Sequence, residues 1–490
     1  RNAHHPKDAG SARRKEMRSV LSVTSECVPL VKTGGLADVA GALPGALREH
    51  GWDMATLLPG YRQVIAKCGK GESVLDLPDL FGGKARVVKA RVAGLPLYVL
   101  DAPHLFDRDG TPYLDANGRD FPDNPERFAA LSWVAARIAS EGAGGWKPEV
   151  LHGHDWQAGL AAYYARKADV PVPSVFTIHN IAFQGVAPAD RLTPLRLDPA
   201  DFTSGGFEFR GQISALKAAL VWSDRITTVS PTYAAELQTP EFGMGMEGLL
   251  RSREADFQGI LNGIDTSVWD PETDPDIATY KTAKGKSRAK AKLQEEFGLA
   301  PSDGPLCAVI SRLSHQKGLD VLLDALPALV DRGGQLVLLG SGDPALESAF
   351  RAAAAHDNVA VHIGYDERLS HRIMAGADAI LVPSRFEPCG LTQLYGLRYG
   401  TIPVVAMTGG LADTVINASP MALRAGVATG VQFQPVTAHA LASALIRTAE
   451  LFQDKKTWAA LQRNAMRQQV GWEVSAAEYA ALYEEVAGSP

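Results

Sequence analysis

Short apolar runs alternate with longer amphipathic stretches along most of the chain. Amphipathic patterns typical of helices, such as 127–139 and 157–167, follow several of these runs. In the first half the apolar runs are 19–23, 55–58, 97–100, 149–152, 174–178 and 225–229. Alternation of this kind is typical of βαβ units, so it predicts a parallel sheet with helices on both faces.

The alternation stops near the middle of the chain and then starts again. Residues 261–290 are rich in Pro, Asp, Thr, Lys and Gly and show no core periodicity, which is typical of a domain boundary. The second series of apolar runs is 306–310, 335–339, 359–363, 379–382 and 402–405. We therefore predict an α/β fold of two doubly wound, Rossmann-like domains at 17–260 and 261–472, with a helix near 476–487 closing the chain.

Polar side chains follow the predicted strands of both series. The first series has Glu26, His152-Gly-His-Asp-Trp and Thr177-Ile-His-Asn, and the second has Ser311-Arg-Leu, Gly364-Tyr and Ser384-Arg-Phe-Glu. Ligands of open α/β sheets bind beyond the carboxyl ends of the strands. The pattern predicts that both domains turn these residues towards one central cleft.

The six residues TGGLAD occur twice, at Thr33–Asp38 and at Thr408–Asp413. Glycine at a strand-to-helix turn lets backbone N–H groups approach an anion, although a tight turn alone can also require glycine. Lys32 beside the first copy, together with Arg312 and Lys317 after a strand of the second series, favours an anionic ligand. Such cations and helix ends can stabilise a diphosphate leaving group without a metal ion.

Glu387 follows another predicted strand and precedes Pro388 and a glycine. A carboxylate fixed there could accept sugar hydroxyls or stabilise positive charge on a sugar ring, or it could be an ordinary helix-capping acid. His152-Gly-His-Asp has the spacing of a metal site, but no second ligand cluster follows, so we interpret it as a strand end and predict no metal. Gly243–Gly248 matches GxGxxG but lacks a preceding strand, so we interpret it as a loop rather than a dinucleotide site.

Composition limits the class of partner. The net charge of −6 gives no indication of binding to nucleic acid or to an anionic membrane, and no apolar run reaches the roughly 20 residues of a membrane span. Four scattered cysteines fit a reducing cytoplasm. We expect the polar, basic residues 1–16 to be a disordered leader or a cloning remnant, with a transit peptide as the alternative.

Taken together, the motifs resemble those of the bacterial glycogen synthases, which are related to plant starch synthases. The matching segments are Lys32-Thr-Gly-Gly-Leu-Ala-Asp-Val, His154-Asp-Trp, Thr177-Ile-His-Asn, Thr228-Val-Ser-Pro-Thr-Tyr-Ala, Leu261-Asn-Gly-Ile-Asp, Ser311-Arg-Leu, Gln316-Lys-Gly, 384–396 and 408–414. The resemblance runs from about Met17 to the C-terminus. It implies a glycosyltransferase of the B type that transfers glucose from ADP-glucose to the non-reducing 4-hydroxyl of an α-1,4-glucan with retention of configuration. It also implies that a C-terminal helix, 473–490, returns to the first domain.

The resemblance implies roles for individual residues. Those expected in catalysis are Glu387, His179, which would contact the transferred glucose, and Asp155 in the same pocket. Lys32 would bind the donor at the glycine turn, Arg312 and Lys317 would neutralise its diphosphate, and Tyr365 would lie near the adenine. The remaining residues implied for ADP-glucose binding are Gly34, Gly35, Gly390, Leu391, Thr392, Thr408 and Gly409. We expect both TGGLAD copies to face the same ADP-glucose, with no cofactor or metal.

Two other functions are compatible with parts of the pattern. A sugar-binding protein of two domains would need no diphosphate cations, and a glycoside hydrolase could use Asp155 and Glu387 as its two carboxylates. For the transferase, both attack from the same face and a covalent intermediate would retain configuration. The sequence makes no prediction of oligomeric state, of strictness for ADP over UDP, or of regulation.

Overall fold

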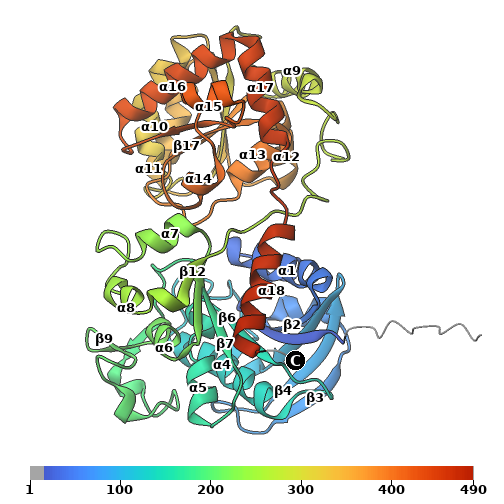
Figure 1. The fold of residues 1–490 in the computed structure, drawn as a ribbon, viewed down its shortest axis with the longest axis vertical. Coiled ribbons are helices and arrows are strands. Elements are labelled where there is room, and N and C mark those ends of the chain that lie inside the picture. The colour runs from blue at the N-terminus through green and yellow to red at the C-terminus, as the bar shows by residue number, and fades with distance from the viewer. Residues whose placement is uncertain (1–15, 489–490) are drawn as a thin grey trace, which may run out of the picture.

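The computed structural model describes residues 16–488, which form two α/β domains stacked end to end (Figure 1). The leader expected at 1–16 lies, except for Glu16, outside the described residues. Each domain is built around its own sheet, and the two sheets share no strand. The prediction of two α/β domains is confirmed.

A nine-stranded sheet forms the centre of the first domain, in the order β12-β11-β7-β6-β1-β2-β5-β4-β3. The strands from β12 to β5 in this order pair in parallel. Their bounds are β1 (Arg18–Val23), β2 (Trp52–Pro59), β3 (Glu72–Leu77), β4 (Ala85–Val92), β5 (Leu95–Asp101), β6 (Val150–His154), β7 (Ser174–Ile178), β11 (Arg225–Thr228) and β12 (Phe257–Gly259).

The edge formed by β3 and β4 differs from the predicted parallel sheet, because both strands pair antiparallel. Antiparallel neighbours need only short turns and no crossover helix, so no helical pattern marks them in the sequence. Both strands are also partly exposed and include charged residues, so they lack the continuous apolar run of a buried parallel strand. A separate small sheet is formed by β8 (Val186–Pro188), β10 (Gln212–Ser214) and β9 (Glu208–Phe209).

Helices cover both faces of the large sheet (Figure 1). They are α1 (Gly35–Leu47), α2 (Arg62–Cys68), α3 (Pro103–Phe106), α4 (Asn124–Glu141), α5 (Ala161–Lys167), α6 (Ala215–Trp222), α7 (Pro231–Glu236) and α8 (Glu247–Ser252). Turns rather than a strand precede Gly243, as predicted, but the motif is not a loop throughout, because Gly248 lies in α8.

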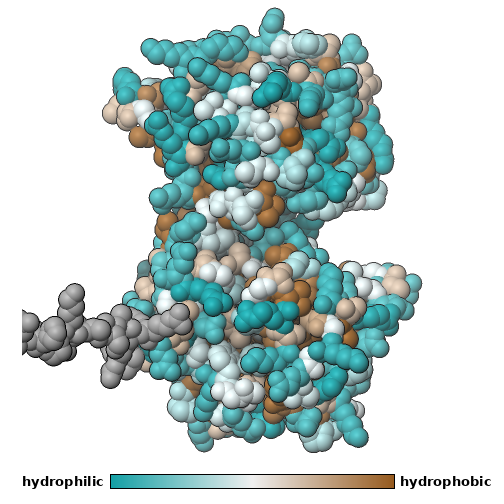
Figure 2. Space-filling view, turned by 90° about the vertical axis from the view of Figure 1, so that its right-hand side faces the viewer, coloured by the Kyte–Doolittle hydropathy of each residue, from teal (hydrophilic) through white to brown (hydrophobic). Residues whose placement is uncertain are grey.

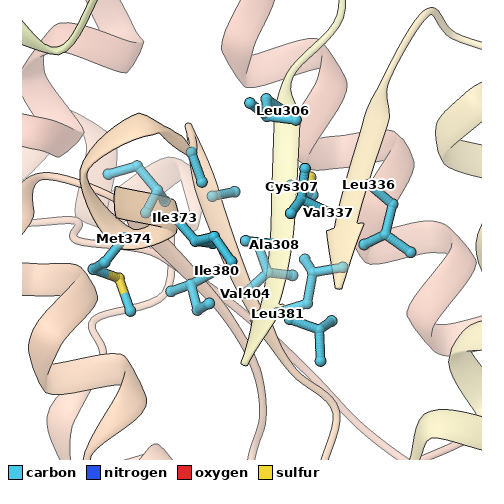
Figure 3. Close-up of a cluster of buried hydrophobic side chains, with 14 of the residues drawn as sticks. Leu306, Cys307, Ala308, Leu336, Val337, Ile373, Met374, Ile380, Leu381 and Val404 are labelled. Carbon is cyan, nitrogen blue, oxygen red and sulfur yellow. The ribbon is translucent and has the colours of Figure 1, made fainter. Parts of the chain in front are cut away.

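The second domain has a six-stranded, fully parallel sheet in the order β15-β14-β13-β16-β17-β18. Its strands are β13 (Leu306–Ile310), β14 (Gln335–Gly340), β15 (Val359–Ile363), β16 (Ala379–Val382), β17 (Ile402–Ala406) and β18 (Val431–Phe433). Its helices are α9 (Lys286–Glu296), α10 (Leu319–Val330), α11 (Pro344–Ala353), α12 (Glu367–Gly376), α13 (Thr392–Tyr399), α14 (Gly409–Thr414), α15 (Pro420–Ala425), α16 (Ala438–Gln453) and α17 (Lys455–Met466). Cys307 is fully buried, and Figure 3 shows it among the apolar side chains of the central strands, as expected for a packed thiol.

The last helix, α18 (Glu473–Ala487), leaves the second domain and packs beside α1 on the first (Figure 1). Its Tyr479 and Tyr483 are fully buried, and the ring of Tyr483 lies 5.3 Å from that of Trp52. Burial of these aromatic rings stabilises the return of the chain. The peptide chain therefore joins the two domains both near residue 260 and near residue 470.

The surface is hollowed at the waist between the domains (Figure 2). A cleft of about 590 Å³ lies there, with walls from both domains. Lys32 and Asp38 line it from the first domain, and Trp269, Tyr365 and Tyr395 line it from the second. No helix within residues 16–488 combines the length and apolarity needed to cross a bilayer.

Candidate active site

Two loops of the second domain bring most of its predicted site residues into one cavity. Arg312 and Lys317 lie on the loop after β13, and Glu387 lies on the loop between β16 and α13. Together with Gly390–Thr392 they line a cavity of about 180 Å³. β13 and β16 are neighbours in a parallel sheet, so the loops at their carboxyl ends necessarily lie side by side.

Charged groups in this cavity are arranged asymmetrically. The Lys317 ammonium lies 2.7 Å from a Glu387 carboxylate oxygen, which also accepts a hydrogen bond of 2.9 Å from the Ser384 hydroxyl. The guanidinium of Arg312 is exposed and has no hydrogen-bond or ion-pair partner within residues 16–488. An anion entering the cavity therefore meets one free cation and one that is already paired with an acid.

Glu387 does not act as a helix-capping acid in this structure. Its carboxylate binds Lys317 and Ser384, and none of the described backbone amides donates to it. Since the group is only 8 % exposed, the nearby ammonium compensates for the loss of hydration of its charge. The alternative interpretation of Glu387 as an ordinary cap is therefore not supported.

Close backbone contact holds the two loops together. Gly318 has a φ of +69°, and a Cβ atom on it would lie 1.8 Å from the carbonyl oxygen of Pro383. Arg385 forms a bidentate ion pair with Asp320 at 2.7 and 2.8 Å. Glycine at 318 is thus required both by the left-handed backbone and by the approach of the second loop.

The small cavity adjoins the cleft between the domains, because Ile310, Leu391 and Thr392 line both. Lys32 faces the cleft from the first domain and pairs with Asp38 at 2.8 Å. Tyr365 is 74 % exposed in the cleft, and its hydroxyl donates to Glu367. The structure therefore places Lys32 and Tyr365 in a cleft that shares a wall with the cavity of Arg312 and Glu387.

Lys32 and Asp38, at either end of the first TGGLAD turn, line the cleft, whereas Gly34 and Gly35 line neither cavity, and some donors of the turn are already used. The buried carboxylate of Glu26 accepts the backbone N–H groups of Thr33 and Gly34 and the Thr33 hydroxyl. A Cβ atom on Gly34 or Gly35 would meet no atom within 4 Å, and the Gly35 amide has no acceptor within residues 16–488. The turn can therefore offer the amide of Gly35, at the start of α1, to a ligand.

The second TGGLAD turn lies elsewhere and corrects the expectation that both copies face one ligand. The Thr408 hydroxyl and the Gly409 amide donate to Glu236 of α7, at 2.7 and 2.9 Å. Neither residue lines the two cavities. A helix of the first domain thus occupies the donors of this turn, and their predicted binding of ADP-glucose has no support in this conformation.

His179 and Asp155 lie at the ends of β7 and β6 in the first domain, outside the walls of both cavities. The ring nitrogens His154 Nδ1 and His179 Nε2 are 2.9 Å apart. Burial lowers the pKa of His154 to about 3 and holds the pKa of His179 well below its usual value. Both imidazoles are therefore neutral at pH 7, and His179 can act as a hydrogen-bonding group rather than as a cation.

Comparison with known proteins identifies the family. The sequence profile of the starch synthase catalytic domain matches residues 19–252, and that of glycosyl transferases group 1 matches residues 291–468. The glycogen synthase of Paracoccus denitrificans (strain Pd 1222) is 60 % identical over 96 % of this chain and 100 % of its own length. The chain belongs to the glycogen synthase family. The glycogen synthase of Jannaschia sp. (strain CCS1) is 59 % identical, again over 96 % and 100 % of the two chains.

Solved structures agree with the assignment to the glycogen synthase family. The catalytic domain of starch synthase IV from Arabidopsis thaliana, bound to ADP and acarbose, superposes with a TM-score of 0.83 at 33 % identity, over 96 % of this chain and 99 % of that one. Sucrose-phosphate synthase from Thermosynechococcus elongatus shares the fold alone, with a TM-score of 0.60 at 19 % identity over 96 % and 98 % of the two chains. The predictions of a B-type fold and of a glycosyltransferase are confirmed.

The metal interpretation of His152-Gly-His-Asp is not supported by the geometry of this family member. One ring nitrogen of His152 lies 2.6 Å from the Thr177 hydroxyl, and the other is hydrogen-bonded to the hydroxyl of Tyr483 on α18. With both nitrogens engaged, His152 has no lone pair to offer a metal. Within the described residues, the one group of acids and histidines close enough to hold an ion is Asp274, Asp276 and His371.

Sequence reasoning missed three residues that shape the site. Glu26 was noted only as a polar residue after a strand, and its position seven residues before Thr33 was the available signal. Trp269 lies in the segment interpreted as a domain boundary, yet its ring stacks between those of His371 and Tyr395 at 3.7 and 3.9 Å and lines the cleft. Nothing in the sequence indicates a role for Glu236, because only the tertiary structure brings it next to Thr408.

Asp155 supports the backbone of His179 and should leave a measurable dependence of stability on pH. One of its oxygens accepts the His179 amide at 2.7 Å, and burial raises its pKa to about 7. Between its unfolded pKa near 4 and about 7 the folded protein binds the extra proton, so Asp155 makes the free energy of unfolding fall as pH rises, by at most about 1.4 kcal/mol per pH unit.

We expect Asp155→Asn to flatten this slope, because asparagine does not titrate yet keeps an oxygen for the His179 amide. Urea unfolding at pH 4.5, 5.5, 6.5 and 7.5 measures the slope of the free energy of unfolding against pH. The matched control is Asp357→Asn, since Asp357 is exposed and should give the wild-type slope. Equal slopes for wild type and Asp155→Asn would contradict the raised pKa.

Proposed function

We propose that the protein transfers glucose from ADP-glucose to the non-reducing 4-hydroxyl of an α-1,4-glucan, with retention of configuration. The observation that carries the proposal is that an Arg312 unpaired within residues 16–488 and a Lys317–Glu387 ion pair line the same cavity, which adjoins the cleft between the domains. The cavity suits a diphosphate sugar, and the cleft is wide enough for a nucleoside. The starch synthase of similar structure is described as bound to ADP and acarbose, which supports a nucleotide and a glucan as ligands.

The donor would be held mainly by the second domain. Arg312 offers a planar fork of donors to the diphosphate, and Lys317 offers a point charge. The Tyr365 ring, which projects into the cleft, would lie against the adenine. The loop Gly390–Thr392 ends where α13 begins, so its amides would bind phosphate or sugar oxygens at a helix N-terminus.

The chemistry follows from where charge develops. As ADP leaves, negative charge grows on the diphosphate beside Arg312 and Lys317, and positive charge grows on the glucose ring beside the Glu387 carboxylate. The acceptor hydroxyl would attack from the same face while a phosphate oxygen takes its proton. These protein cations can stabilise the leaving group without a metal, so we propose a reaction that needs no cofactor.

The first domain would complete the site by approaching the second. Lys32, the Gly35 amide and His179 belong to the first domain, and His179 lies outside the cavity walls of this conformation. Closure would bring the neutral imidazole of His179 to the glucose hydroxyls and Lys32 to the donor. It would also exclude water, which would otherwise hydrolyse ADP-glucose. The unpaired cysteines are consistent with a reducing cytoplasm as the place of this reaction.

A three-way incubation tests the proposal. With ADP-glucose and glycogen the protein should release ADP and lengthen glucan chains, and both products should be absent when the protein is omitted. Glycogen alone should remain unchanged, because the cations of the cavity stabilise a leaving diphosphate and would not promote attack of water on a glycosidic bond. Binding of sugar without ADP release would indicate a binding protein, and shortening of glycogen would indicate a hydrolase. Either result would overturn the proposed function.

A further inference from the structure

The two TGGLAD copies hold a carboxylate in the same way but use different acids. In the first copy the Thr33 hydroxyl and the Gly34 amide donate to Glu26 of the same domain. In the second copy the Thr408 hydroxyl and the Gly409 amide donate to Glu236 of the other domain. The same turn therefore lies beside the cleft in one copy and at a contact between the domains in the other.

The contact of the second copy is reciprocal. Glu236, at the end of α7, binds the first residues of α14, and Asp413, near the end of α14, binds the first residues of α7. Asp413 accepts the backbone amide of Thr232 at 2.7 Å and its hydroxyl at 2.6 Å. Each helix thus supplies the capping carboxylate of the other, an arrangement that satisfies free amides at both helix N-termini.

The helix pair also holds the backbone of the loop that carries Glu387. The Gly410 amide donates to the carbonyl oxygens of Glu387 and Pro388, at 3.1 and 3.0 Å, and the Ser230 hydroxyl donates to Pro388 at 2.6 Å. A Cβ atom on Gly409 would lie 1.9 Å from the Glu387 carbonyl oxygen. One side of this loop is therefore held by hydrogen bonds and close packing against α14 and the start of α7.

We propose that α7 and α14 form a permanent joint between the domains, and that Glu236 and Asp413 are positioning residues that orient Glu387 through this joint. The inference rests on the proposed function, because it concerns how the two halves of that active site are aligned. Closure then rotates the domains about the joint, while the Lys317–Glu387 pair keeps its orientation. The carboxylates of Glu236 and Asp413 each cap the N-terminus of the other helix through charge-assisted hydrogen bonds. This capping gives the second TGGLAD turn a role although the turn does not line the cavity.

A reversible cross-link tests whether the joint stays together. The side chains of Thr232 and Asp413 meet, so the double variant T232C/D413C should form a disulfide on mild oxidation. Loss of Asp413 should lower the kcat of both forms of this variant, but we expect the oxidised form to keep kcat within about twofold of its own reduced form, since closure would not separate the helices. A loss of activity restored by a thiol would overturn the proposal, and so would failure of the disulfide to form. Wild-type activity in the same assay is measured first, so an inactive wild type would count against the proposed function instead.

Substitution of Glu236 tests the positioning role. Glu236→Ala should lower kcat about tenfold or more and leave the KM for ADP-glucose and the Kd for ADP within about threefold, because the donor-binding residues keep their places. Glu236→Gln should restore most of kcat, since the amide oxygen can still accept the Gly409 N–H. The control is Glu485→Gln, which removes an exposed ion pair between α18 and Arg225 and should leave kcat unchanged. If Glu236→Ala lowers only the melting temperature, or if Glu236→Gln is as slow as Glu236→Ala, the positioning role is wrong.

Discussion

Replacing Lys317 by alanine should lower kcat by about 100-fold or more, which is the usual effect of removing one preorganised group that stabilises developing charge. Lys317 lies in the cavity with Arg312, and its ammonium is 2.7 Å from Glu387. Without it the leaving diphosphate loses one of two cations, and the Glu387 carboxylate loses its ion-pair partner. Steady-state release of ADP from ADP-glucose with glycogen measures the change, and Lys317→Arg should recover part of the rate because it keeps the charge.

The chain contains a matched control for this substitution. Lys290 pairs with Asp378 at the same 2.7 Å, and the side chains are 20 % and 12 % exposed, against 20 % and 10 % for Lys317 and Glu387. Lys290→Ala should therefore lower the melting temperature by a similar amount while leaving kcat unchanged. A Lys317→Ala enzyme as fast as Lys290→Ala would show that Lys317 has only a structural role.

Replacing Gly318 by alanine should reduce both stability and activity strongly. The Cβ atom would lie 1.8 Å from the Pro383 carbonyl oxygen, so the loop of Arg312 and Lys317 would have to move away from the loop of Glu387. The left-handed backbone costs about 1–2 kcal/mol for alanine, and overpacking adds about 1–3 kcal/mol. A displacement of the loops by about 1 Å should lower kcat by roughly tenfold to 100-fold.

The substitution Gly426→Ala separates the backbone cost from the overpacking as causes of the expected loss of stability. The φ of Gly426 is +71°, against +69° at Gly318, but a Cβ atom there would meet nothing within 4 Å. Gly426→Ala should therefore show the backbone cost alone, with normal kcat. Urea unfolding and the transferase assay on both variants measure the difference. Equal destabilisation of the two variants, with normal activity, would mean that the loops do not depend on their close approach.

The structure assigns different uses to the two copies of TGGLAD. Gly34 and Gly35 face open space beside the cleft, whereas Gly409 and Gly410 pack against the backbone of residues 387–389. The same glycines therefore border open space in the first domain and allow close packing in the second. Neither use is visible in the six residues themselves, because both depend on which segment packs against the turn.

Much of the architecture could be predicted from the sequence, because it follows from local patterns. Buried parallel strands are mostly apolar runs, so β1, β7, β13 and the other central strands were identifiable from the local sequence pattern. The edge strands β3 and β4 were not, since they are partly exposed and lack such runs. Residues at the carboxyl ends of adjacent strands must converge, which is why Arg312, Lys317 and Glu387 could be grouped before any coordinates were known.

Contacts between distant segments were decided by the tertiary structure alone. The sequence by itself determined two α/β domains, their motifs and the family resemblance. It did not determine that Glu236 would occupy the second glycine turn, or that Asp155 would support the His179 backbone. A hydrogen bond depends on the relative position of two segments in three dimensions, and for residues 173 positions apart, such as Glu236 and Gly409, only the packing of the two domains sets that position.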